Sequence, residues 1–131
     1  MLLTKSIYLP RIKEDGLRIS IMSRHTLSDG VTPDPKIKRE NYDVWLKILA
    51  PPTKLVGDYY KRSLSWEEYE REYLRFLRHR SQRVVILHIT NAALSKDITL
   101  LCVEENPEKC HRRLLAEECK RYNPDLALRI G

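Results

Sequence analysis

The chain has 131 residues, 42% of them hydrophobic and 32% charged, which fits one domain with a core that needs no disulfide or metal to stabilise it. Lys and Arg outnumber Asp and Glu by 24 to 18, and this net charge of +6 favours phosphate-bearing partners. No apolar run approaches the roughly 18 residues of a transmembrane helix, and the first residues lack the basic leader of a signal peptide. The composition therefore predicts a cytoplasmic protein without a membrane-spanning segment.

Cysteine and glutamine usage add two expectations. The three cysteines, Cys102, Cys110 and Cys119, are an odd number, which argues against a disulfide framework. Gln82 is the one glutamine among many Arg, Lys, Glu, Ile and Leu residues, a usage typical of thermophiles.

Two strands are predicted near the start of the chain. Residues 2–8 are apolar and β-branched, and residues 17–22 alternate apolar and polar side chains with the period of a strand. The link between them is too short for a crossover helix, so we expect the two strands to pair antiparallel or to lie apart in the sheet. Residues 23–41 follow as a long polar loop, since they hold two prolines, a glycine and several charges.

Helical signals come next in the chain. Tyr42, Trp45, Leu46 and Leu49 keep helical spacing until two prolines interrupt it, and a short helix capped by Thr53 is expected after these prolines. Ser65 and Glu68 form a capping box ahead of the clearest amphipathic helix in the chain. Residues 82–94 are ambiguous, because their β-branched density favours a strand and their length favours a helix.

The last third of the chain predicts a strand, a helix and a strand. Residues 98–103 form a short apolar run typical of a buried central strand. Asn106 and Pro107 are typical of a helix start, so we expect a helix over 107–122 and a last strand over 126–130. Such a unit is expected to form a right-handed parallel crossover.

Several motifs resemble the family known as domain of unknown function 488, including its YeaO-like branch. The matching stretches are Ile7-Tyr8-Leu9-Pro10, Glu14-Asp15-Gly16-Leu17-Arg18-Ile19, Ser23-Arg24, Trp45-Leu46-Lys47 with Leu49-Ala50-Pro51, and Leu100-Leu101-Cys102 followed by Cys110-His111-Arg112. The chain departs from the YeaO-like pattern after Arg24, where His25-Thr26-Leu27 stands in place of Leu-Trp-Pro-Arg-Gly.

The resemblance implies an α/β domain with helices flanking a small sheet, and it implies a helix ahead of the Leu-Leu-Cys strand. The resemblance does not indicate a reaction for this protein. Together with the patterns above, it predicts one domain over 1–131, of three-layer type, with a small mixed and partly parallel sheet.

A ligand site is expected where strands end, since ligands of α/β sheets bind at the carboxyl ends of strands. Arg24 follows one strand, and Asn106 and Arg112 accompany the predicted helix start, whose free N–H groups favour an anion. The two arginines offer bidentate contacts to phosphate or carboxylate. The structural alternative is that Arg112 pairs with Glu108 and that Arg24 holds the long loop.

Glu104, Cys110 and His111 are the candidate catalytic residues. Lys109 and Arg112 beside Cys110 favour a thiolate, and Glu104 is placed to act as a general acid or base. Adjacent helical residues do not face each other, however, so a packed cysteine and a hydrogen-bonded histidine are the alternative reading of Cys110 and His111. The spacing of Cys102, Cys110 and His111 predicts neither a tyrosine-phosphatase loop nor a zinc site, and no cofactor is expected.

The leading hypothesis is thus a small enzyme or ligand-binding domain for a phosphate-containing or nucleotide-like molecule. The alternative is a basic module that associates with nucleic acid or protein without catalysis. No helix-turn-helix, zinc-finger or RNA-recognition motif supports a nucleic-acid partner. The sequence leaves the oligomeric state open, and a third hypothesis is redox sensing through Cys110.

Overall fold

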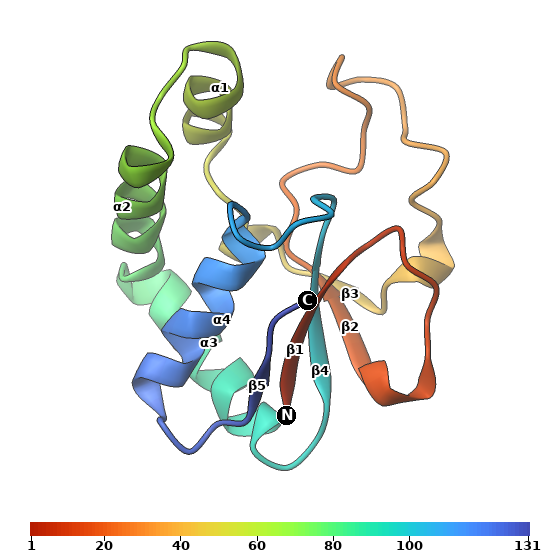
Figure 1. Cartoon of the computed structure of the whole chain (residues 1–131), viewed down its shortest axis with the longest axis vertical. Coiled ribbons are helices and arrows are strands. Elements are labelled where there is room, and N and C mark those ends of the chain that lie inside the picture. The colour runs from red at the N-terminus through yellow and green to blue at the C-terminus, as the bar shows by residue number, and fades with distance from the viewer.

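The computed structural model describes residues 1–131 as an α/β domain built on one five-stranded sheet (Figure 1). The strands are β1 (Leu2–Ser6), β2 (Leu17–Ser20), β3 (Val44–Trp45), β4 (Ile98–Cys102) and β5 (Leu128–Arg129), in the spatial order β3-β2-β4-β1-β5. Every strand pair is parallel. The α/β prediction is confirmed, but the sheet is parallel throughout and not mixed.

The first two strands lie apart in the sheet, because β4 inserts between them. Leu2 and Leu17 are both in register with Ile98, from opposite sides of β4. Of the two arrangements expected for these strands, the separated one is therefore correct and antiparallel pairing does not occur. All five residues of β4 are buried, as its apolar sequence predicts for a central strand.

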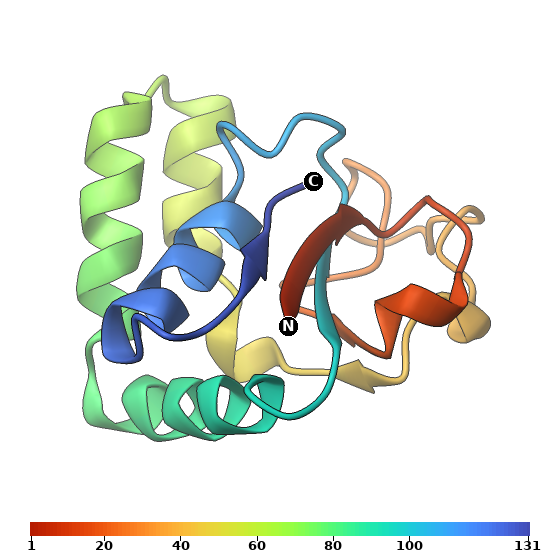
Figure 2. The ribbon, with the colours of Figure 1, turned by 60° about the horizontal axis from the view of Figure 1, so that its bottom comes forward.

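Four helices lie on one side of the sheet: α1 (Thr53–Lys61), α2 (Trp66–Leu77), α3 (Arg80–Ala93) and α4 (His111–Tyr122). Figure 2 shows these helices on one side, while the other side is covered by the links between β1, β2 and β3. These links contain short 3₁₀ turns at Lys13–Asp15 and Arg39–Asn41 and no α-helix. The second outer layer of the predicted three-layer arrangement thus consists of loops and turns.

The handedness of parallel crossovers explains this division. The chain runs in one direction along the sheet from β3 to β4 and from β4 to β5, and both connections carry helices. It runs in the opposite direction from β1 to β2 and from β2 to β3. Right-handed crossovers that run in opposite directions lie on opposite faces of a sheet, so all four helices gather on one face.

The main core lies between the sheet and the helices. It joins strand residues such as Ile19 and Leu100 to Tyr73, Ile86 and Leu115 of the helices. Burial of Ile86, Ile89 and Ala93 at helical spacing decides the ambiguous segment 82–94 as helix α3, in spite of its β-branched content. None of the helices has the length and apolar character required to cross a membrane.

Two other predictions of helix need correction. Residues 42–49 form the edge strand β3 and a 3₁₀ turn, because Ile19 pairs with Val44 at the edge of the sheet. The last helix begins at His111 and not at Pro107, so residues 103–110 form a loop. The Asn106 side chain accepts a hydrogen bond from the Glu108 amide at 2.9 Å, which makes Asn106 a turn residue instead of a helix cap.

The short helix after the two prolines forms, but it begins at Thr53 with Pro52 as its N-cap residue, so Thr53 does not cap it. The predicted last strand is shorter and covers Leu128–Arg129. The other predictions of secondary structure are confirmed. The Ser65 side chain caps α2 by accepting a hydrogen bond from the Glu68 amide at 3.1 Å. The long segment 23–41 is mostly irregular, apart from the isolated bridge between Thr26 and Pro33 and the turn Arg39–Asn41.

Candidate functional site

The carboxyl ends of β2 and β4 meet at a point where the chain leaves the sheet in opposite directions. After β2 the chain enters the loop layer, and after β4 it enters the helical layer through the loop 103–110. Connections that diverge in this way leave a crevice at the carboxyl ends of the strands. Ligands of α/β proteins bind at such switch points. The predicted site residues of the loop 103–110 lie at this edge.

Two cysteines and a histidine converge here, and we call Cys102, Cys110 and His111 the Cys–His cluster. Cys102 ends β4, Cys110 precedes α4 and His111 opens it. Their sulfur and ring-nitrogen atoms lie within 4.8 Å of one another. The sequence argument that Cys110 and His111 cannot face a common point assumed that both are helical, whereas Cys110 has extended backbone as the N-cap residue.

His111 is oriented by two contacts. Its Nε2 lies 3.0 Å from the Ile21 carbonyl oxygen, and its Nδ1 lies 3.6 Å from Cys102 Sγ. Because a carbonyl oxygen only accepts hydrogen bonds, Nε2 carries the proton. The tautomer with its proton on Nε2 presents the Nδ1 lone pair to Cys102, which is the arrangement of a general base beside a thiol.

The two buried thiols have different acidities. Cys102 and Cys110 are only 3% and 2% exposed. A hydrogen bond from Cys110 lowers the pKa of Cys102 against the opposing effect of burial, with help from the Glu104 amide and the charge of Arg112. The same hydrogen bond and burial raise the pKa of Cys110. Cys102 is thus the preferred site of a thiolate in this pair.

Arg112, a predicted ligand contact, lies completely buried under the loop 103–110. Its guanidinium donates hydrogen bonds to the carbonyl oxygens of Glu104 at 2.6 Å, Glu105 at 3.3 Å and Gly131 at 3.0 Å, and to Cys110 Sγ at 3.3 Å. It does not pair with Glu108. Arg112 therefore holds the loop in place and contributes a buried positive charge beside the thiols.

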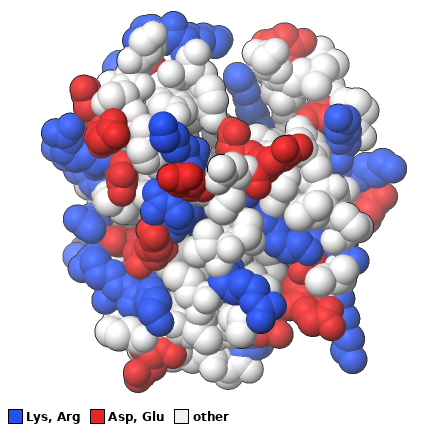
Figure 3. Space-filling view, in the orientation of Figure 1, with Lys and Arg blue, Asp and Glu red and all other residues white.

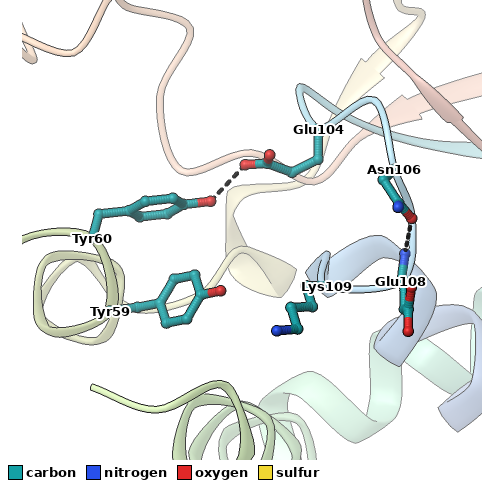
Figure 4. Close-up of a pocket in the computed structure, with 6 residues that line it drawn as sticks. All are labelled: Tyr59, Tyr60, Glu104, Asn106, Glu108 and Lys109. Carbon is teal, nitrogen blue, oxygen red and sulfur yellow. Dashed lines mark hydrogen bonds between the residues drawn. The ribbon is translucent and has the colours of Figure 1, made fainter. Parts of the chain in front are cut away.

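An open cleft of about 390 Å³ lies outside this loop, and we call it the Tyr60–Glu104 cleft (Figure 4). Tyr60 donates a hydrogen bond to Glu104 at 2.5 Å across it, from α1 to the end of β4. In Figure 4 the Lys109 side chain extends towards Tyr59. The lining residues are Tyr59, Tyr60, Glu104, Asn106, Glu108 and Lys109. Its volume is in the range of small-molecule sites.

Arg24 lies elsewhere. Its side chain is exposed on the loop after β2, where its guanidinium packs against Gly30, and it makes no ion pair or hydrogen bond. The predicted residues Glu104 and Asn106 share the Tyr60–Glu104 cleft, and Cys110 and His111 share the Cys–His cluster. Arg24 is in neither group.

A further histidine sits at the end of β2. The Nε2 atom of His25 lies 2.7 Å from Ser20 Oγ, and its ring stacks on Trp45 with the ring centroids 3.7 Å apart. Burial, together with the nearby charge of Lys47, lowers the pKa of His25 to about 4. This histidine is therefore neutral at pH 7.

Cys102 was weighed in the sequence as a phosphatase or zinc residue and set aside, although it ends a strand whose carboxyl end was predicted as a ligand-binding edge. Four residues that line the cleft were not predicted site residues: Tyr59, Tyr60, Glu108 and Lys109. Tyr59 and Tyr60 carried no signal of a site in the sequence. They belong to a helix about 40 residues away in sequence, and only the packing of α1 beside the loop 103–110 brings them to the cleft.

Comparison with known proteins identifies the family. A family profile described as the active DUF488-N3 subclade, DUF488-N3a, matches residues 2–123. The chain belongs to the DUF488 family. The match spans both cysteines of the cluster and the loop between them, so the resemblance carried by the Leu-Leu-Cys and Cys-His-Arg motifs is confirmed. Searches among curated proteins and among solved structures gave no significant match to this chain.

Proposed function

We propose that this DUF488 protein is a small cytoplasmic enzyme or ligand-binding protein that takes a phosphate-bearing or nucleotide-like molecule in the Tyr60–Glu104 cleft. The observation that carries the proposal is the convergence of this cleft, the Cys–His cluster and the loop 103–110 at one sheet switch point. In α/β proteins such a point is where ligands bind.

The lining of the cleft suits a planar, polar ligand with an anionic group. The rings of Tyr59 and Tyr60 offer faces for stacking a heterocycle. Lys109 offers the one positive charge of the lining to a phosphate, which would have to lie away from the carboxylates of Glu104 and Glu108. Glu104 and Asn106 provide hydrogen-bond acceptors for ribose hydroxyls or exocyclic amines. Arg24, the second predicted contact for the anion, lies on the loop after β2 and does not line the cleft.

Within this proposal Glu104 supplies the reactive group in the cleft. Its carboxylate lies two residues after Cys102 and is the candidate acid or base there. The two thiols of the Cys–His cluster are buried and do not line the cleft. The expected chemistry in the cleft is therefore proton transfer.

The test is a thermal-shift panel with purine and pyrimidine nucleotides, ribose phosphate and inorganic phosphate. A ligand at 100 times its dissociation constant stabilises the folded state by about 2.7 kcal/mol, which shifts the melting temperature by several degrees. Lys109→Ala and Tyr60→Ala are each expected to weaken a nucleotide about tenfold, since a charge-assisted contact or a stacked ring is worth about 1–3 kcal/mol.

Arg83→Ala is the matched control, because Arg83 is an exposed basic residue on α3, away from the cleft. It should leave the affinity unchanged, and Arg24→Ala tests the second contact. Affinity that is the same in the Lys109, Tyr60 and Arg83 variants would place the ligand elsewhere. No shift with any small molecule would favour the interaction module without catalysis.

The alternative of a nucleic-acid-associated module has weaker support. Arg78, one of the basic residues that suggested it, forms a two-point ion pair with Glu118. Figure 3 shows acidic and basic side chains interspersed across the visible face, where a binding surface for phosphates would be uniformly basic. Oligonucleotides in the same panel test it, because such binding should weaken steeply as salt is added.

A further inference from the structure

We propose that the Cys–His cluster is a binding site for a soft divalent metal ion of the zinc class, with Cys102 Sγ, Cys110 Sγ and His111 Nδ1 as its three protein ligands. The three atoms come from the end of β4, the residue before α4 and the first residue of α4, and they lie within 4.8 Å of one another. Sequence spacing alone did not predict this site, because seven residues separate the two cysteines in a loop whose path only the fold defines.

The separations fit tetrahedral coordination. Zinc binds sulfur at about 2.3 Å and imidazole nitrogen at about 2.0–2.1 Å, so a sulfur and a nitrogen sharing one ion lie about 3.6 Å apart, and two sulfurs about 3.8 Å apart. The distance from Cys102 Sγ to His111 Nδ1 is 3.6 Å. The widest separation in the cluster is at most 4.8 Å, so closure on an ion needs a movement of about 1 Å.

The hydrogen bond of His111 with a backbone carbonyl oxygen already orients the ring for metal binding. Histidines that bind metals usually donate their other ring N–H to a carboxylate or a backbone carbonyl, which fixes the ring and its tautomer. His111 Nε2 lies 3.0 Å from the Ile21 carbonyl oxygen, so the free lone pair is on Nδ1 and points into the cluster. No rotation of the ring is required.

The charge around the sulfurs also favours an anionic cluster. Arg112 is completely buried and has no carboxylate among its hydrogen-bond partners, and its one side-chain partner is Cys110 Sγ at 3.3 Å. A hydrogen bond from a guanidinium stabilises a metal-bound thiolate. With two thiolates balancing a divalent ion, the Arg112 charge favours an anion at the fourth coordination position, which three protein ligands leave open.

The test uses fully reduced, chelator-treated protein and the metal alone. Titration with Co²⁺ should give the visible bands of a tetrahedral site and a thiolate charge-transfer band in the near ultraviolet, saturating at one ion per chain. Zn²⁺ should displace Co²⁺ and raise the melting temperature, whereas Mg²⁺ should do neither, because it prefers oxygen ligands.

The third cysteine provides the matched control. Cys119 is equally buried but lies in α4 beyond the cluster, so Cys119→Ala should keep the cobalt spectrum and the zinc affinity. Cys102→Ala, Cys110→Ala and His111→Asn should each lower the affinity at least about 100-fold, since even outer-shell changes cost about 10–100-fold.

The wild-type spectrum decides the proposal even if a variant does not fold. Absence of stoichiometric binding at micromolar metal would overturn it, as would a charge-transfer band that survives in both cluster-cysteine variants. Because no nucleotide or phosphate is present, failure of the metal site leaves the proposed ligand cleft untouched, and the two proposals can fail separately.

Discussion

Two buried guanidinium groups connect the sheet to the layers on either side of it. Arg18 reaches into the loop layer, where it pairs with Asp15 at 2.7 Å and donates to the carbonyl oxygens of Leu9 and Asn41. Arg112 likewise donates to the carbonyl oxygens of Glu104 and Glu105 in the loop 103–110. Both side chains are completely buried, so these carbonyl oxygens supply the acceptors that a buried guanidinium requires.

Arg112 is therefore expected to matter for stability whatever ligand the protein binds. Arg112→Ala should lower the free energy of unfolding by about 3 kcal/mol, because it opens a cavity and removes the hydrogen bonds that hold the loop 103–110. Arg113→Ala is the neighbouring control. Arg113 is partly exposed and pairs with Glu117 along the helix, so its loss should cost less than about 1 kcal/mol. Urea unfolding measures both, and equal losses would contradict the structural role of Arg112.

His25 predicts how stability depends on pH. Its pKa in the folded protein is about 4, whereas a histidine in the unfolded chain titrates near 6.5. Between these values the unfolded chain binds a proton that the folded protein does not. The free energy of unfolding should therefore be highest above pH 6.5 and fall as the pH drops towards 4, by about 3 kcal/mol.

The variant His25→Phe keeps a ring against Trp45 but does not titrate. Its stability should be lower at pH 7, because the hydrogen bond with Ser20 is lost, and should fall less steeply than that of the wild type between pH 6.5 and 4. Urea unfolding at several pH values measures the two slopes. NMR titration of the His25 ring provides the direct value, and a pKa near 6.5 would refute the prediction.

At the scale of elements, the turn into β2 depends on a glycine. Gly16 has a φ of +61°, and a Cβ atom there would lie 2.1 Å from the Asp97 carbonyl oxygen. This close approach is needed because Leu17 donates its amide hydrogen to the same oxygen at 3.0 Å, which aligns β2 with β4. The stretch around Asp15-Gly16 was noted in the sequence as part of the family resemblance, but the contact of Gly16 with a residue 81 positions later was not predicted.

Gly16→Ala should accordingly destabilise the protein by more than about 2 kcal/mol, through both backbone strain and steric overlap. Gly57→Ala is the opposite case. Gly57 lies inside α1, where an added Cβ meets only the end of the flexible Arg62 side chain, so alanine should stabilise the helix by up to about 1 kcal/mol. Melting temperatures of the two variants should move in opposite directions, and a shared direction would refute the argument.

For the whole molecule, the direction in which the chain runs along the sheet determines where the candidate site lies. Four helices occupy one face because the connections that carry them run the same way, and the loop layer occupies the other (Figure 2). The Tyr60–Glu104 cleft and the Cys–His cluster lie where the two layers part. The net charge of +6, by contrast, is spread among acidic side chains and marks no single surface in Figure 3.

Local sequence patterns are sufficient to predict several elements of the fold. The capped helix at Ser65, the buried strand ending in Cys102 and the α/β class follow from periodicity, capping residues and apolar runs, and the Cys-His-Arg motif was sufficient to suggest the family. Glu104, Asn106, Cys110 and His111 were recognised as candidates because they accompany a strand end and the start of a helix.

Contacts between residues distant in sequence determine the remaining features. Packing against the sheet made residues 82–94 a helix in spite of their β-branched content, and edge pairing with Ile19 made Val44 a strand residue in spite of helical spacing. The extended backbone at Cys110 lets Cys110 and His111, which seemed to point apart, meet Cys102 in a cluster. Tyr60 joined Glu104 by helix packing, and Arg112 passed from a ligand candidate to a buried support, because burial and partners are properties of the fold and not of spacing.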